Sequence, residues 1–156
     1  MEKYNFGEDV SYLLVHNKLG IKTLEQLEMA EAYAFMIRAL EIENGLYKIA
    51  EFTKHSYTAL HRYLFQDIYT FAGKFRKVQL SKGSTRFCQF QYIDQMADEI
   101  FTALNVEGDW RDIETAAKRL AYFKAELNML HPFREGNGRA TRIFIRAYAR
   151  TKGYEC

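Results

Sequence analysis

The chain has 156 residues, of which 48% are hydrophobic and 27% charged, and this size and composition are typical of one soluble globular domain. Twenty-two Lys and Arg against 20 Asp and Glu leave a net charge of +2 without any basic cluster, which argues against nucleic-acid and membrane partners. Two cysteines, Cys88 and Cys156, make no disulfide framework, and no apolar run approaches the ~18 residues of a membrane span. We therefore expect a cytoplasmic protein.

The N-terminal arm, residues 1–22, comes first along the chain. Residues 4–18 are predicted to be irregular and to pack on the domain through three positions, Tyr12, Leu13 and Leu14. Neither a continuous apolar stretch nor an arginine-rich amphipathic pattern marks this start as a targeting signal.

Two helices are predicted next. Thr23 followed by Gln26 has the pattern of a capping box, which opens a helix that runs to about Glu43. The pair at residues 44–45, Asn-Gly, ends that helix because these residue types accept left-handed backbone conformations. A second helix is predicted over residues 53–65.

The spacing of apolar residues changes over residues 75–90. Apolar and polar side chains alternate up to Ser81, and a turn at residues 82–84 precedes a second short run. This pattern predicts a short β-hairpin. An exposed two-stranded ribbon is either a passive surface feature or an edge on which an extended segment can dock.

Two longer helices follow the hairpin. Apolar residues recur at helical spacing between residues 93 and 104, and again between residues 113 and 130. Because the only proline is Pro132, nothing interrupts these runs. The sequence therefore predicts a single, mainly α-helical (all-α) domain over residues 1–156.

The signature segment, residues 131–142, reads HPFREGNGRATR. It combines one histidine, one carboxylate, two glycines around an asparagine, and three arginines. Glycines let backbone N–H groups turn toward an anion, and arginines meet phosphate oxygens in bidentate fashion. The glycines would also open a helix whose N-terminal amides favour anions.

The segment matches neither a Walker A loop nor a Rossmann turn. It predicts a polyphosphate site with His131 beside the phosphates.

This segment resembles, position for position, the HxFx(D/E)GNGRxxR signature of the Fic (filamentation induced by cAMP) family, whose usual members transfer AMP from ATP to a protein hydroxyl. Upstream, LFQDIYTFAGKFR (64–76), LSKGSTRF (80–87) and NKLGI (17–21) are also similar to family segments. The resemblance spans residues 17–142. It implies a bacterial Fic domain with a flap hairpin beside the active-site loop, either cytoplasmic or, as an effector, delivered into a host cell.

Nucleotidyl transfer needs a base, a metal, and donors for the pyrophosphate leaving group. His131 is the candidate base, because an imidazole of ordinary pKa near ~6.5 can take a proton at neutral pH. The resemblance implies that it deprotonates a target hydroxyl, which then attacks the α-phosphorus of ATP. Glu135 is a hard carboxylate that suits Mg²⁺, and the lack of a Cys/His cluster disfavours zinc. By resemblance Glu135 occupies the metal position, where many relatives carry Asp.

The rest of the segment is expected to bind phosphates. Gly136, Asn137 and Gly138 fit a turn with Asn137 as the helix N-cap, and the resemblance implies an anion-binding nest. Arg139 and Arg142 lie three residues apart and hence on one helical face. The resemblance assigns them to the β- and γ-phosphates, respectively.

Other aromatic and histidine side chains are expected to be structural. Phe133 should point into the core and hold the loop. The other three histidines, His16, His55 and His61, are expected to be structural or exposed. The aromatic residues between positions 61 and 75 are assigned to the core.

In the family that the chain resembles, the flap pairs in β fashion with the target and brings its Tyr, Thr or Ser to the histidine. Residues 79–89 would do this here, with four expected contacts, Gln79, Lys82, Arg86 and Phe87.

Many family members are held inactive by a helix that bears [ST]xxxE[GN], whose glutamate pairs with the second signature arginine. Three Glu-Gly or Glu-Asn pairs occur in this chain, at residues 43–44, 107–108 and 135–136, and the residues four positions earlier are Ala39, Ala103 and His131. None matches the motif. The glutamate is expected on a separate small antitoxin, on a segment beyond Cys156, or nowhere. A toxin paired with an antitoxin is favoured over an effector's catalytic domain.

Two alternatives to adenylyl transfer stay open. A relative could transfer phosphate or phosphocholine, although phosphate-transferring relatives carry Lys where Gly138 stands, which favours AMP. A catalytically inactive interaction module is the other alternative, and the intact base, acid and arginines argue against it.

Overall fold

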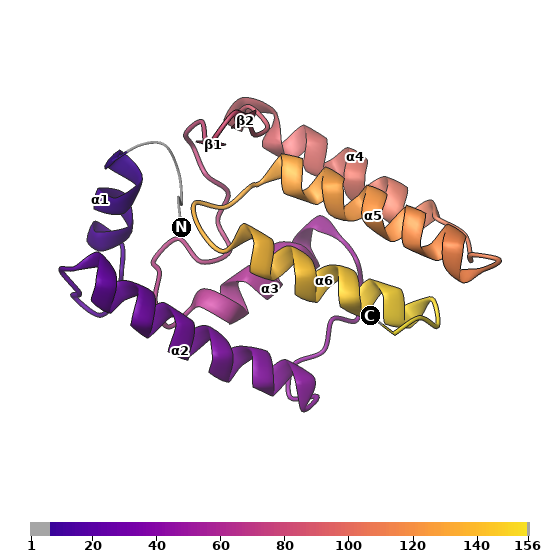
Figure 1. The fold of residues 1–156 in the computed structure, drawn as a ribbon, viewed down its shortest axis with the longest axis horizontal. Coiled ribbons are helices and arrows are strands. Elements are labelled where there is room, and N and C mark those ends of the chain that lie inside the picture. Colours follow the sequence, from indigo (N-terminus) through magenta and orange to yellow (C-terminus); the bar gives the residue numbers. More distant parts are fainter. Residues whose placement is uncertain (1–6, 156) are drawn as a thin grey trace.

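The computed structural model describes residues 7–155, and their side chains from residue 10 onward. These residues form a bundle of helices with one small hairpin (Figure 1). The predicted all-α fold class with a short hairpin is confirmed. In chain order the elements are α1 (Gly7–Val15), α2 (Leu24–Glu43), α3 (Lys54–Phe65), β1 (Ser81–Lys82), β2 (Thr85–Arg86), the 3-10 turn η1 (Phe90–Tyr92), α4 (Ile93–Val106), α5 (Ile113–Leu130) and α6 (Asn137–Thr151).

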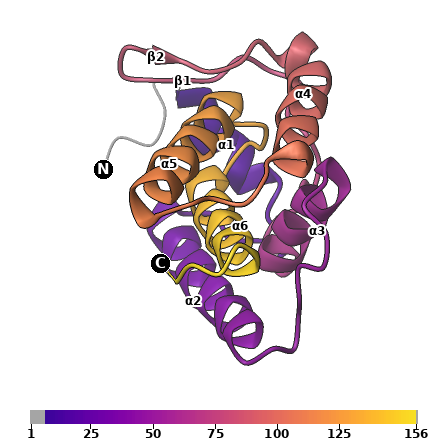
Figure 2. The same ribbon diagram turned by 90° about the vertical axis from the view of Figure 1, so that its right-hand side faces the viewer.

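Helix α6 occupies the middle of the bundle. Figure 1 shows α2 along one side, α4 with α5 along the other, and α3 and α6 between them. The view in Figure 2 places α2, α3 and α5 around α6. The loop that joins α5 to α6 lies at the same end of the helices as the hairpin. The signature segment thus begins at that end of the bundle and continues into the central helix α6.

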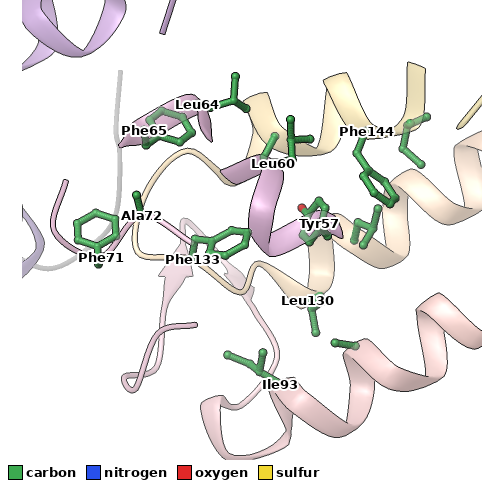
Figure 3. Packing of buried hydrophobic residues seen from close by; sticks show 14 of the residues in the cluster. Tyr57, Leu60, Leu64, Phe65, Phe71, Ala72, Ile93, Leu130, Phe133 and Phe144 are labelled. Carbon is green, nitrogen blue, oxygen red and sulfur yellow. The ribbon is translucent and has the colours of Figure 1, made fainter. Parts of the chain in front are cut away.

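Aromatic rings fill the core between α3 and α6. Tyr57 of α3 is fully buried, and its ring centroid lies 5.1 Å from that of Phe144 and 5.6 Å from that of Phe133 (Figure 3). Its hydroxyl forms a 2.8 Å hydrogen bond with Oγ1 of Thr141. Aromatic pairs of this kind contribute ~0.5–1.5 kcal/mol beyond the area they bury. The core therefore holds α6 and the loop before it against α3.

The helix ends follow local sequence rules. Thr23 caps α2 by accepting the N–H of Gln26, as predicted, and α2 ends at Glu43 as predicted. The reciprocal bonds of a capping box occur instead at α3, between Thr53 and Ser56. The chain leaves α2 through Gly45, whose φ is +77°.

The prediction of an irregular N-terminal arm is wrong where the structure describes it, because α1 is a helix; the first part of the predicted segment lies outside the described residues. A nine-residue helix is too short to be stable alone, so its stability comes from tertiary contacts. Leu13 is buried in the core. The Tyr12 ring stacks on His16 at 3.9 Å and lies under the guanidinium of Arg134 at 3.8 Å.

The hairpin is present but smaller than predicted. Its strands are two residues each, with Ser81 opposite Arg86 and Lys82 opposite Thr85 around a two-residue turn. One further backbone bond, from Phe87 N to the carbonyl of Leu80 at 3.1 Å, extends the pairing. In the described part of the chain no helix is long and apolar enough to span a membrane.

Candidate active site

A pocket of about 690 Å³ opens at the N-terminus of α6. Four parts of the chain line it: α2, the hairpin, the end of α5, and the signature segment. Seven of the signature residues named from the sequence reach it, together with Lys82 and Phe87 of the hairpin. The full lining is Glu28, Glu31, Lys82, Thr85, Phe87, Asn128, His131, Glu135, Gly136, Asn137, Gly138, Arg139 and Arg142.

His131 ends α5 in a left-handed conformation, with φ +44° and ψ +58°. It is the single non-glycine residue with positive φ between residues 7 and 155. Such a conformation costs a non-glycine residue ~1–3 kcal/mol and persists only where the surroundings enforce it. The turn carries the imidazole out of the α5 direction and into the pocket lining.

The tautomer of His131 follows from its partner. Nδ1 lies 3.1 Å from the carbonyl oxygen of Asn128, which can only accept, so Nδ1 carries the proton and Nε2 the lone pair. The Phe87 ring stacks on the imidazole at 3.7 Å with an interplanar angle of 6°. Burial lowers the pKa of His131 to about 4, and the positive charges of Arg76 and Lys82 act in the same direction. The imidazole is therefore neutral at pH 7 and able to accept a proton.

Arg76 fixes the backbone around His131, a role that sequence reasoning missed. This buried guanidinium donates to the carbonyls of His131 at 2.7 Å and Leu130 at 3.2 Å. It also donates to the carbonyls of Val78 at 2.7 Å and Cys88 at 2.6 Å, on either side of the hairpin. One side chain thus ties the hairpin base to the end of α5. Arginine is common on surfaces, so no sequence pattern could mark this one as buried.

The loop after His131 is closed by Asn137. Its Oδ1 accepts the N–H of Phe133 at 2.8 Å, and its Nδ2 donates to the carbonyl of Phe133 at 2.6 Å. The predicted N-cap role of Asn137 is wrong, because Gly136 occupies the N-cap and Asn137 is the first residue of α6. Phe133 itself is fully buried, in agreement with its predicted position in the core.

Gly136 is required by geometry. Its φ is +81°, and a Cβ built there would lie 2.4 Å from the ring of Phe65. Real atoms essentially never approach so closely, and the ring belongs to the core. The first amides of α6 therefore have no capping side chain at residue 136, which leaves a positive helix end beside the pocket.

His61 of α3 supports the signature loop through hydrogen bonds. Its Nδ1 accepts the N–H of Gly73 at 2.9 Å, so its Nε2 carries the proton and donates to the carbonyl of Glu135 at 2.8 Å. The ring stacks on Phe133 at 3.7 Å. Burial lowers the pKa of His61 to about 3. The predicted structural role of this histidine is confirmed.

Glu135 is buried beside the positive end of α6. Its Oε1 accepts the N–H of Gly136 at 3.0 Å and lies 3.6 Å from Nη2 of Arg139. Among residues 7–155 no group of three His, Cys, Asp or Glu side chains could hold a metal by itself. A single hard carboxylate fits Mg²⁺, which takes much of its coordination from substrate phosphates and water.

The two signature arginines differ in setting. Arg139 is half-buried: its guanidinium lies 4.9 Å above the ring of Phe65 and 5.2 Å from that of Phe35. Nη2 pairs with Glu31 of α2, a buried carboxylate that sequence reasoning missed. Arg142, one turn further along α6, is exposed on the pocket wall and makes no ion pair within the described residues.

The four hairpin residues named from the sequence fall in different places. Lys82 reaches the active-site pocket, and Phe87 is buried against His131. Arg86 lines a separate groove of about 400 Å³ between the hairpin, α4 and α5. The Gln79 amide donates to the carbonyls of Phe87 at 2.8 Å and Leu80 at 3.2 Å, and so braces the hairpin.

Comparison with known proteins identifies the family. Residues 51–149 match the model of the Fic/DOC family. Proteins named probable protein adenylyltransferase Fic, from Escherichia coli and Salmonella typhimurium, are each 37% identical to this chain and are covered over 78% of their lengths, with 99% and 98% of this chain aligned. The protein adenylyltransferase VbhT of Bartonella schoenbuchensis is 38% identical over 90% of this chain and 30% of its own length. The chain belongs to the Fic/DOC family.

Solved structures share the fold. The effector BepC of Bartonella tribocorum, with bound AMPPNP, superposes with a TM-score of 0.81 at 21% identity and covers 88% of this chain and 73% of its own. The N-terminal Fic domain of a putative cell filamentation protein from Bartonella quintana, with bound ADP, gives 0.76 at 26% identity over 89% and 72% of the two chains.

Proposed function

We propose that this protein is a protein adenylyltransferase, which transfers AMP from ATP to a Tyr, Thr or Ser hydroxyl of a target protein. One observation carries the proposal: a neutral imidazole with its lone pair on Nε2 shares a pocket with two arginines and the positive end of α6. A base and anion donors in one pocket are what nucleotidyl transfer requires. The names of the curated relatives support the same reaction.

In this mechanism Nε2 of His131 removes the proton of the target hydroxyl. The hydroxyl oxygen attacks the α-phosphorus, the bond from that phosphorus to the bridging oxygen of the β-phosphate breaks, and pyrophosphate leaves. Arg139 and Arg142, with the amides of residues 136–138, bind the phosphates and stabilise charge on the leaving group. Mg²⁺, when bound through Glu135, would neutralise phosphate charge and orient the chain of phosphates.

The hairpin is proposed to dock the target. Lys82 and Arg86 are its basic side chains, and both lie on the paired strands. A target segment that adds as a further strand would have its register set by backbone bonds, independent of its side chains. Phe87 and Gln79 support this indirectly, since one stacks on the base and the other holds the hairpin together.

Mass spectrometry tests the reaction. The protein is incubated with Mg²⁺-ATP and a bacterial lysate, and the protein itself and lysate proteins are searched for modified Tyr, Thr and Ser. An adenylyl adduct that depends on His131 supports the proposal. A phosphoryl adduct would indicate the related phosphotransferase. Phosphocholine transfer is tested in a parallel reaction with its own nucleotide donor. The absence of an adduct on any protein would indicate an inactive interaction module.

The partner that we propose is a small antitoxin that carries [ST]xxxE[GN]. The enzyme would then act as a toxin in the bacterial cytoplasm. The second proposed role for the enzyme is that of an effector delivered into a host cell. The support is Arg142, exposed in the pocket and without an ion pair among the described residues. A peptide with this motif should inhibit transfer by competing for the γ-phosphate position. Arg142→Ala should abolish that inhibition, and inhibition that persists in the variant would contradict the proposed contact.

A further inference from the structure

A buried carboxylate of α2 lies in the pocket that we assign to ATP phosphates. Glu31 is 4% exposed and lines the pocket. Its Oε1 pairs with Nη2 of Arg139, and its Oε2 accepts the hydroxyl hydrogen bond of Tyr69, itself 1% exposed. The negative charge of Glu31 repels a bound phosphate directly. Any favourable effect of Glu31 on the reaction must therefore come through the groups that it contacts.

Three contacts besides Glu31 restrict Arg139. The rings of Phe35 and Phe65 lie 5.2 Å and 4.9 Å from the guanidinium carbon, and Glu135 Oε1 lies 3.6 Å from Nη2. Both carboxylates approach the same nitrogen, Nη2. A guanidinium has five N–H donors, so engagement of one nitrogen leaves donors for a phosphate.

We propose that Glu31 is a positioning residue for the reaction: together with Tyr69 it holds Arg139 over the rings of Phe35 and Phe65 in the orientation that binds ATP phosphate. The inference rests on the proposed function. An arginine side chain that is already ordered loses less conformational freedom when the nucleotide binds. The ordering acts on nucleotide affinity and leaves the proton transfer to His131 unchanged.

A second consequence concerns Glu135. Glu135 is the other carboxylate that pairs with Arg139 Nη2 among the described residues, at a distance of 3.6 Å. Without Glu31, Arg139 would shift toward it and compete for the carboxylate that we assign to Mg²⁺. Loss of Glu31 should therefore raise both the ATP and the Mg²⁺ concentrations needed for half-maximal rate.

The test compares Glu31→Gln and Tyr69→Phe with Glu25→Gln, which removes the same charge from an exposed position in the first turn of α2. AMPPNP binding is measured by calorimetry with Mg²⁺, and KM and kcat are measured for transfer. Glu31→Gln should weaken binding and raise the KM for ATP about tenfold, the scale of one lost charge-assisted hydrogen bond, with kcat little changed. Tyr69→Phe should act in the same direction more weakly, and Glu25→Gln should match the wild type.

The double variant Glu31→Gln, Arg139→Gln separates positioning from simple structural support. If Glu31 acts through Arg139, its loss has no further effect in the Arg139→Gln background. Equal losses in both backgrounds, unchanged affinity in Glu31→Gln, or tighter binding in Glu31→Gln would each overturn the inference; the last outcome would make Glu31 a block. If the wild-type protein binds no AMPPNP and transfers no AMP, the proposed function is overturned as well. If the wild-type protein is active and the Glu31 variants behave like it, this inference alone is overturned.

Discussion

At the scale of single residues, two histidines at this site have different roles. His61 and His131 are both buried and both have a lowered pKa, to about 3 and about 4. The hydrogen bonds decide the difference. His61 uses both ring nitrogens on backbone groups and does not line the pocket, whereas His131 binds the Asn128 carbonyl through Nδ1 and lines the pocket. Of these two histidines, His131 is therefore the one that we propose as the base.

Replacement of His131 by alanine should remove transfer and keep nucleotide binding. The base acts on the acceptor and contributes little to ground-state affinity, so the rate should fall ~10²–10⁴-fold or more while the Kd for AMPPNP stays close to that of the wild type. Rates and calorimetric affinities are compared with those of His55→Ala, which alters an exposed histidine on α3. A parallel loss of affinity and rate would contradict the assignment.

The pH dependence of kcat/KM should have its acid limb well below the ordinary pKa of histidine. The pKa of His131 is lowered to about 4, so the base stays deprotonated through pH 5 and the rate falls only as the pH approaches 4. Lys82→Gln removes one positive charge that lowers this pKa, and the limb should move to higher pH. Titration of ATP is common to both proteins, so the difference between the profiles reports His131. Identical profiles would contradict the prediction.

At the scale of elements, the hairpin and the signature loop behave as one unit. Arg76 N donates to the Pro132 carbonyl at 2.8 Å, and Cys88 N donates to the Met129 carbonyl at 2.9 Å, in addition to the four bonds of the Arg76 side chain. A proline at Cys88 would break this attachment, so it cannot test docking alone. The base of the hairpin therefore has a fixed position relative to His131, as the proposed docking of a target requires.

Proline at Ser81 or at Arg86 should show whether the target adds as a strand. These residues face each other between the bonded pairs of the hairpin, so their N–H groups point away from the partner strand. One of the two prolines should therefore cut target modification severely while AMPPNP affinity stays unchanged. Ser81→Ala and Arg86→Ala are the matched controls. If both proline variants modify the target at the normal rate, the docking site lies elsewhere.

At the scale of the whole molecule, the site and the core are the same structure. Phe133 and the ring of Phe65 belong to the hydrophobic core and also shape the loop (Figure 3). Helix α6, whose first residues line the pocket, runs through the centre of the bundle (Figure 2). Protonation of a buried site residue must therefore affect global stability.

The free energy of unfolding should fall as the pH decreases from about 6.5 toward 4. His61 and His131 have folded pKa values below the unfolded value of 6.5, so the unfolded state binds more protons in this window, and their contribution is complete only above it. The slope approaches ~1.4 kcal/mol per pH unit for each histidine. Urea unfolding at pH 5, 5.5, 6 and 7 measures it. His131→Asn, which tolerates the left-handed backbone, should reduce the slope by about half; an unchanged slope would refute the pKa assignment.

The sequence by itself determined the class of fold and named most of the signature residues that line the candidate site. A capping pattern and an Asn-Gly stop placed α2, and periodic apolar spacing placed α4 and α5, nearly at their observed bounds, since caps and helix periodicity are local properties. The signature segment placed its histidine, acid, glycines and arginines together because they are neighbours on one loop and helix start.

Only the tertiary structure decided which side chains from distant parts of the chain join the signature residues. Glu31, His61 and Arg76 come from three separate segments, and each is buried and binds partners distant in the sequence, which local patterns do not encode. The same reason explains the two local errors: α1 is stabilised by contacts with the rest of the chain, and Asn137 bonds back to Phe133 because the loop closes over the core. Local spacing specifies elements, whereas burial and charge pairing depend on how those elements pack.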